Sequence, residues 1–118
     1  MSEKQPRIQI DHRGDVTVVD LLDHEILDEL RINEISDSLF AVVDEQTQVK
    51  LVLNFQAVTH LSSSALGTLI RLNKKIEESK GQFRLCSIRK SLYEIFVITR
   101  LNKVFKIHDD VDAAIKSM

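Results

Sequence analysis

Residues 50–67 read KLVLNFQAVTHLSSSALG, which joins a strand pattern to a helix pattern. The run from 50 to 55 is short and apolar, as expected of a buried strand. In the segment 63–79, apolar side chains recur at helical spacing along one stripe, which predicts a helix that packs on a sheet. The stripe consists of Leu66, Leu69, Ile70 and Ile76. A buried strand followed by an amphipathic helix predicts a βα unit.

The sequence before this unit predicts a hairpin and a first helix. Apolar and polar residues alternate in 7–12 and 16–22 on either side of a turn that contains a Gly-Asp pair, which indicates two antiparallel strands. From Asn33, a residue type that often caps helices, apolar side chains recur at helical spacing up to about Gln46. They are Ile35, Leu39, Phe40, Val42 and Val43.

The sequence after the unit continues the alternation of strands and helices. Gly81 predicts the end of the helix. The further elements are a strand at Phe83–Cys86, a helix marked by Leu92, Ile95 and Phe96, a strand at Val104–Ile107 and a short helix capped by Asp109 or Asp110. The order ββαβαβαβα predicts an α/β fold with right-handed crossovers and a mixed, mostly parallel sheet.

The composition fits one globular domain over residues 1–118, with a flexible tail at 1–6. Hydrophobic residues make up 43% and charged residues 29%. A formal net charge of −2, the absence of Trp and a single tyrosine argue against direct nucleic-acid binding. The polar start lacks the apolar region of a signal peptide, and no apolar run is long enough to span a membrane. We therefore expect a cytoplasmic protein without membrane insertion.

The residues needed for common catalytic and metal sites are scattered. Three glycines cannot supply a P-loop or a dinucleotide fingerprint, and the four histidines lie far apart in the sequence. The acidic segment 20–25 is interpreted as a solvated loop, and Cys86 as a buried thiol. His60 and Ser63 lie near each other without the Gly-x-Ser-x-Gly motif of hydrolases. We expect neither a metal site, nor a cofactor, nor catalysis.

The serine triplet Ser62-Ser63-Ser64 lies between the buried strand and the helix. A serine hydroxyl at this place caps the free N–H groups of the first helical turn, and one serine is enough for that role. Three serines at the carboxyl end of a strand also fit a site, because sites in α/β sheets gather at that edge. The residues alone leave both interpretations open.

Residues 53–67 resemble the central signature of STAS domains, the family of anti-sigma factor antagonists and sulfate-transporter tails. The matching pattern is Leu53-Asn54-Phe55-x-x-Val58-x-x-Leu61 followed by Ser62-Ser63-Ser64-Ala65-Leu66-Gly67. The similarity continues through Cys86-Ser87-Ile88 and Phe105-x-Ile107, and extends roughly from residue 7 to residue 117. The order ββαβαβαβα also resembles the fold of the family.

The resemblance implies roles for single residues. The first serine after an aspartate is the phospho-acceptor in anti-sigma factor antagonists, and that position is Ser63 here. Ser64 matches the following Ser or Thr of the family. The sequence departs from the family pattern at four positions: Asn54 and Ser62 replace aspartates, and Ala65 and Arg100 replace glycines. If the backbone at Arg100 requires a positive φ, the arginine is strained.

The resemblance further implies a partner-switching regulator that is not an enzyme. Such a domain binds an anti-sigma factor, usually a serine protein kinase, and phosphorylation of Ser63 would separate the complex. The expected docking residues are His60, Leu61, Ser62 and Ser64, with Arg71, Lys74 and Lys75 as candidate rim charges. Two alternatives keep the fold and change the partner: a non-phosphorylated STAS scaffold, as in a stressosome, and an accessory subunit of a lipid-transport ATPase. A homodimer is left open.

Overall fold

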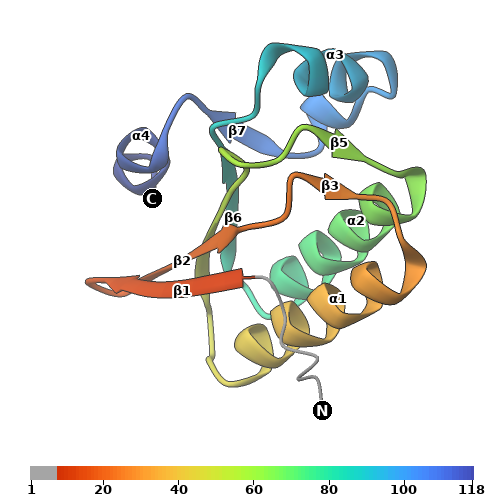
Figure 1. Ribbon diagram of the computed structural model, residues 1–118. Helices are drawn as coiled ribbons and strands as arrows, with labels where there is room; N and C mark the ends of the chain where they lie inside the picture. Colours follow the sequence, from red (N-terminus) through yellow and green to blue (C-terminus); the bar gives the residue numbers. More distant parts are fainter. Residues whose placement is uncertain (1–7) are drawn as a thin grey trace.

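A five-stranded sheet with helices on both faces organises the described part of the chain, residues 8–118 of a computed structural model (Figure 1). The strand order is β1-β2-β4-β6-β7; β1 pairs antiparallel with β2, and the other neighbours are parallel. The strands are β1 Ile8–Arg13, β2 Val16–Leu21, β4 Lys50–Asn54, β6 Gln82–Cys86 and β7 Lys106–His108. The predicted α/β class with a mostly parallel sheet is confirmed. The tail predicted for residues 1–6 lies outside the described residues.

The helices divide the core into two unequal parts. Helices α1 and α2 cover one face of the sheet, and the large core between them and the strands includes Leu39, Leu53 and Leu72. The short α4 covers a smaller cluster around Val52 and Ala114 on the other face (Figure 1). Helix α3 and the 3-10 helix η1 lie beyond the carboxyl ends of the parallel strands. The bounds are α1 Glu29–Asp44, α2 Ser63–Glu78, α3 Lys90–Ile98, η1 Leu101–Lys103 and α4 Val111–Lys116.

Two further strands, β3 (Glu25–Ile26) and β5 (His60–Leu61), pair in parallel outside the main sheet. They tie the segment that follows β2 to the segment that precedes α2. The backbone N–H and the hydroxyl of Thr59 reinforce this link, since both donate to the carbonyl of His24, at 2.6 and 2.9 Å. The sequence predicted neither strand, because two residues are too few to show an alternating pattern.

Helix α1 begins about one turn earlier than the predicted start at Asn33. Asp28 is the N-cap residue, and its carboxylate accepts a hydrogen bond from the backbone N–H of Arg31 at 3.3 Å. Ile32 is buried and extends the apolar stripe toward the N-terminus. Asn33 therefore lies inside the helix on its exposed side, and the prediction of a cap there was wrong.

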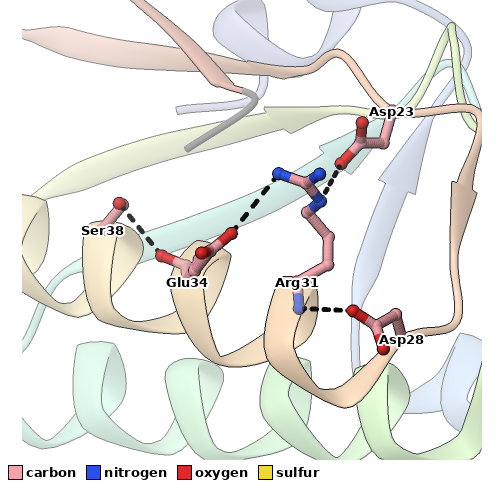
Figure 2. Close-up of polar contacts among 5 residues, drawn as sticks. All are labelled: Asp23, Asp28, Arg31, Glu34 and Ser38. Atoms are coloured by element: carbon pink, nitrogen blue, oxygen red, sulfur yellow. Dashed lines mark hydrogen bonds and ion pairs between the residues drawn. The ribbon is translucent and has the colours of Figure 1, made fainter. Parts of the chain in front are cut away.

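The side chain of Arg31 fixes the start of α1 to the segment after β2 (Figure 2). Its Nε lies 3.3 Å from Oδ2 of Asp23, and its Nη1 lies 3.4 Å from Oε1 of Glu34. Within the same helix, the hydroxyl of Ser38 donates to the backbone carbonyl of Glu34 at 3.1 Å. The ion pair with Asp23 gives one residue of the acidic segment 20–25 a structural role.

Helix α2 ends in a Schellman motif whose left-handed residue is Lys80, with φ 62°. The N–H of Lys80 donates to the carbonyl of Glu77, and the N–H of Gly81 donates to that of Ile76 at 2.8 Å. The prediction that Gly81 itself ends the helix was therefore wrong. Gly81 serves close packing instead, because a Cβ atom there would lie 2.5 Å from the carbonyl oxygen of Val49.

Arg100 adopts the left-handed conformation after α3, with φ 63° and ψ 17°. This is the position where many relatives are expected to carry glycine, so the arginine accepts the backbone strain raised by the sequence comparison. At Arg100 the chain turns from α3 into η1, and it reaches the sheet only at Lys106. The strand predicted from Val104 is therefore shorter, because Phe105 turns into the core before pairing begins.

Candidate functional site

The three serines of the triplet have different structural roles. Ser62 is the N-cap residue of α2, with φ −85° and ψ 167°, and its hydroxyl accepts a hydrogen bond from the N–H of Ala65 at 3.1 Å. Ser63 is the first helical residue and is exposed, as is Ser64. The cap is therefore Ser62, whereas the sequence alone did not say which of the three serines has this role. The hydroxyls of Ser63 and Ser64 lie at the surface of the helix N-terminus.

Strand β5 holds the other two predicted docking residues. His60 is exposed, whereas the side chain of Leu61 packs against the core. The backbone N–H of Ser62 donates to the carbonyl of Ile26 at 3.1 Å, which continues the pairing of β3 and β5 to the start of α2. Of the five predicted site residues, His60, Ser63 and Ser64 present side chains to solvent, while Leu61 and Ser62 mainly position them.

The imidazole of His60 contacts Thr59 and Glu25 and makes no hydrogen bond to the serine triplet among the described residues. Its Nδ1 lies 2.9 Å from the hydroxyl of Thr59 and 3.7 Å from Oε2 of Glu25. Among the described residues, no hydrogen bond joins His60 to Ser63. A nucleophile and its general base must lie within hydrogen-bond reach of each other. The arrangement therefore gives no support to a serine–histidine mechanism.

Asn54, one of the departures from the family pattern, bridges the carboxyl ends of two strands. Its Nδ2 donates to Oδ1 of Asp20 at 2.8 Å, and its Oδ1 accepts from the backbone N–H of Gln56 at 3.1 Å. An aspartate at position 54 would place two carboxylates in contact, which is unfavourable. Both side chains line a shallow hollow of about 220 Å³, together with Leu22, Gln56 and Ala57. The sequence did not predict this hollow, because its walls come from separate segments.

The exposed side of α2 includes one residue that the sequence had placed in the buried stripe. Ile70, predicted to belong to the buried stripe, is 42% exposed, so that prediction was wrong. Ser63, Gly67, Ile70 and Lys74 follow each other at i, i+4, i+7 and i+11, which places them on one side of a helix. The buried side is formed by Ala65, Leu66, Thr68, Leu69, Leu72 and Ile76.

The three candidate rim charges differ in their contacts. Lys75 pairs with Asp44 of α1 at 3.1 Å, so it links two helices. The guanidinium of Arg71 donates to the hydroxyl of Thr68 at 3.1 Å, and its Nη1 would lie 3.7 Å from a Cβ atom on Gly67. Arg71 thus folds back over Gly67 toward the N-terminus of α2. Arg71 and Lys74 pair with no carboxylate among the described residues, and they lie about two and three turns from Ser63 along α2.

Groups suited to metal or redox chemistry do not gather in the described residues. Residues 8–118 contain no cluster of three or more His, Cys, Asp or Glu side chains that could hold a metal ion. Cys86 is a free, fully buried thiol, and desolvation raises its pKa to about 11. The same part of the chain has no helix with the length and apolar character needed to cross a membrane.

The fold and the serine-bearing start of α2 are those of one domain family. The sequence model of the STAS domain family matches residues 7–114, and the chain belongs to this family. A candidate anti-sigma factor antagonist from Thermotoga maritima is 28% identical over 69 residues, which cover 58% of this chain and 61% of that protein. The match thus spans less than two thirds of that relative.

Solved structures of the same family share the fold. A STAS domain protein from Planctomyces limnophilus, described as an anti-sigma-factor antagonist, has a TM-score of 0.83 at 23% identity over 93% of this chain and 95% of its own. SpoIIAA of Bacillus in its phosphorylated form has a TM-score of 0.69 at 17% identity, over 93% of this chain and 97% of its own. At these identities the likeness concerns the fold alone. The chain therefore has the STAS fold.

Proposed function

We propose that this protein is an anti-sigma factor antagonist that binds an anti-sigma factor or serine protein kinase through the start of α2. The observation that carries the proposal is that the serines of the triplet have different roles. Ser62 caps the helix, which leaves the hydroxyl of Ser63 exposed at the first helical position. The family name of the relatives supports the same class of partner. Such partners would place the protein in the cytoplasm.

The proposed docking surface combines the serines with the exposed side of α2. Ser63, Gly67 and Ile70 give a nearly flat strip, because glycine has no side chain and the serine side chain is short. Ile70 supplies an apolar contact, and Arg71 and Lys74 supply charges at the margin. His60 extends the surface across β5. An apolar contact surrounded by polar and charged side chains is the usual composition of a reversible protein interface.

Phosphorylation of Ser63 would reverse binding without unfolding the domain. A phosphate adds about −1.5 to −2 charges at pH 7, which a helix N-terminus tolerates but a packed interface does not. Arg71 lies about two turns further along α2, and its guanidinium extends back over Gly67 toward Ser63. Ser62 caps the helix without the carboxylate of the family pattern, so the hydroxyl of Ser63 is not used for capping. We therefore propose Ser63 as the acceptor.

The test uses the anti-sigma factor encoded beside the gene, with ATP and four forms of the protein: wild type, Ser63→Ala, Ser63→Asp and Ser64→Ala. We expect phosphate to be incorporated into the wild type and Ser64→Ala but not into Ser63→Ala. Ser63→Asp should bind the anti-sigma factor weakly. Equal binding by all four forms would contradict the switch. Phosphate on Ser64 in a digest of the labelled protein would move the acceptor by one residue.

A non-phosphorylated scaffold is the second candidate, favoured by the neutral Ser62 where the family pattern has an aspartate. A scaffold would assemble with other STAS domains, and an accessory subunit of a lipid-transport ATPase would instead purify with that enzyme. Size-exclusion chromatography with light scattering separates these outcomes from a monomer or a homodimer. A large complex together with unlabelled Ser63 would favour the scaffold.

A further inference from the structure

The surface of α3 and η1 exposes more large apolar side chains than any other segment of comparable length in residues 8–118. Five of the ten exposed large apolar side chains described lie between residues 93 and 104. They are Tyr93, Ile95, Val97, Ile98 and Val104, and Ile98 is 80% exposed. We call this surface the α3–η1 patch. Such concentrations of apolar side chains commonly mark interaction surfaces.

The exposed side chains are not unused core residues, because α3 is already anchored on its inner side. Leu92 and Phe96 are buried there at 2% and 0% exposure, and Phe96 meets Phe105 edge to face at 6.0 Å. At the start of the helix, Nε of Arg89 donates to the carbonyl of Val58 at 3.1 Å. A nine-residue helix fixed at its start and along its inner face holds the outer side chains in place.

The charge of the same segment is opposite to that of the chain. Residues 89–106 contain five basic side chains and one acidic side chain, Glu94, whereas the whole chain has a formal net charge of −2. The basic residues are Arg89, Lys90, Arg100, Lys103 and Lys106, and all are exposed. None of them pairs with a carboxylate among the described residues. The patch is therefore both apolar and positively charged.

The apolar character and the positive charge of the α3–η1 patch favour some binding partners over others. A second copy docked patch to patch would bring five cations against five, which is repulsive. The cores of protein interfaces are depleted in charged residues, lysine in particular, yet here lysines are interleaved with the apolar side chains. At a lipid surface the same mixture is favourable, because lysine stems lie along the apolar region while their ammonium groups reach the headgroups. Tyrosine also prefers that boundary.

We propose that the α3–η1 patch adsorbs to the surface of an anionic membrane. Helix α3 would lie along the headgroup region, with Ile98, Val97 and Val104 at the apolar boundary and the cations among the lipid phosphates. The left-handed residue Arg100 leads the chain from α3 into η1, and the two segments contact each other. This binding is peripheral and independent of the docking proposed for Ser63.

Vesicle co-sedimentation with the full chain tests the proposal. The vesicles contain phosphatidylcholine alone, or phosphatidylcholine with one-third phosphatidylglycerol, each at low and at high salt. We expect binding only to the anionic vesicles and release at high salt. Lys103→Ser should weaken binding about fivefold, and Ile98→Ser about tenfold.

Matched controls come from distant surfaces. Ile10→Ser removes an isoleucine that is 43% exposed on β1, and Lys116→Ser removes an exposed charge on α4. Neither change should alter sedimentation, and circular dichroism should show that all four variants are folded. The proposal is wrong if the wild type does not sediment with anionic vesicles, which would leave the patch to an acidic protein partner. Equal losses in the controls, or equal binding to neutral vesicles, would also overturn it.

Discussion

Replacing the serines of the triplet one at a time should affect stability at Ser62 only. Ser62 accepts the hydrogen bond from Ala65 N–H that satisfies one of the free donors in the first turn of α2. Ser63 and Ser64 are exposed and lie within the helix. We therefore compare Ser62→Ala, Ser63→Ala and Ser64→Ala, with Ser62→Asp as the variant that restores the residue of the family pattern.

The expected magnitudes follow from these contacts. Ser62→Ala loses the cap and should lower the free energy of unfolding by about 1 kcal/mol. Ser63→Ala and Ser64→Ala should leave it unchanged or raise it by up to about 0.5 kcal/mol, since alanine is the better helix former. Ser62→Asp keeps the cap and adds a charge that the helix dipole favours, which should stabilise by about 0.3–1 kcal/mol.

Urea unfolding followed by circular dichroism measures these differences. With a slope of about 2 kcal/mol per molar urea, a loss of 1 kcal/mol lowers the midpoint by about 0.5 M. The same loss lowers the melting temperature by about 4 °C in a domain of this size. The slope itself should not change, because none of the four substitutions alters the buried surface much.

Two outcomes would contradict the assignment of the cap to Ser62. If Ser63→Ala or Ser64→Ala costs as much as Ser62→Ala, the cap is assigned to the wrong serine; in the case of Ser63→Ala, the Ser63 hydroxyl is also not available as an acceptor. If Ser62→Asp is as unstable as Ser62→Ala, an aspartate cannot cap α2 in this chain. In the second case the departure from the family pattern would be a structural requirement of this chain.

Further predictions concern four single residues. Arg100→Gly should stabilise by about 0.5–1 kcal/mol in a thermal melt because it relieves the positive φ, whereas Arg100→Ala should give no gain. Gly81→Ala should cost about 2 kcal/mol, since its Cβ would meet Val49 O at 2.5 Å. Gly67→Ala, whose Cβ has room, should stabilise by about 0.5–1 kcal/mol yet weaken partner binding. Cys86 should resist thiol reagents at pH 8 until the chain unfolds. If Cys86 in the folded protein reacts as fast as an exposed thiol, its burial is contradicted. Because its pKa rises from 9.0 to about 11 on folding, its contribution to stability is complete below pH 9 and declines as the pH increases toward 11.

The order of strands and helices could be predicted because each long element has its own period. The apolar run at β4 and the helical stripe of α2 each extend over enough residues to show whether the period is that of a strand or a helix. The boundaries were less certain where two capping residues compete. Asp28 and Asn33 both suit a helix start, and the decision came from Ile32, which is buried against the sheet.

The candidate site was only partly predictable for a similar reason. The sequence located the serines at the start of α2, since a strand precedes them and a helix follows. It could not show which serine is the cap, because three consecutive serines have the same local propensity. It also placed Ile70 in the core, as its spacing does not separate the edge of an apolar stripe from its centre.

The α/β class, the mostly parallel sheet and the place of the triplet follow from the sequence alone, because hydrophobic period and chain order are local properties. Which groups meet across the chain depends on how the elements pack. The tertiary structure pairs β3 with β5, brings Asn54 to Asp20, and leaves Ile98 in solvent. These outcomes depend on contacts between distant segments, and no local pattern records them.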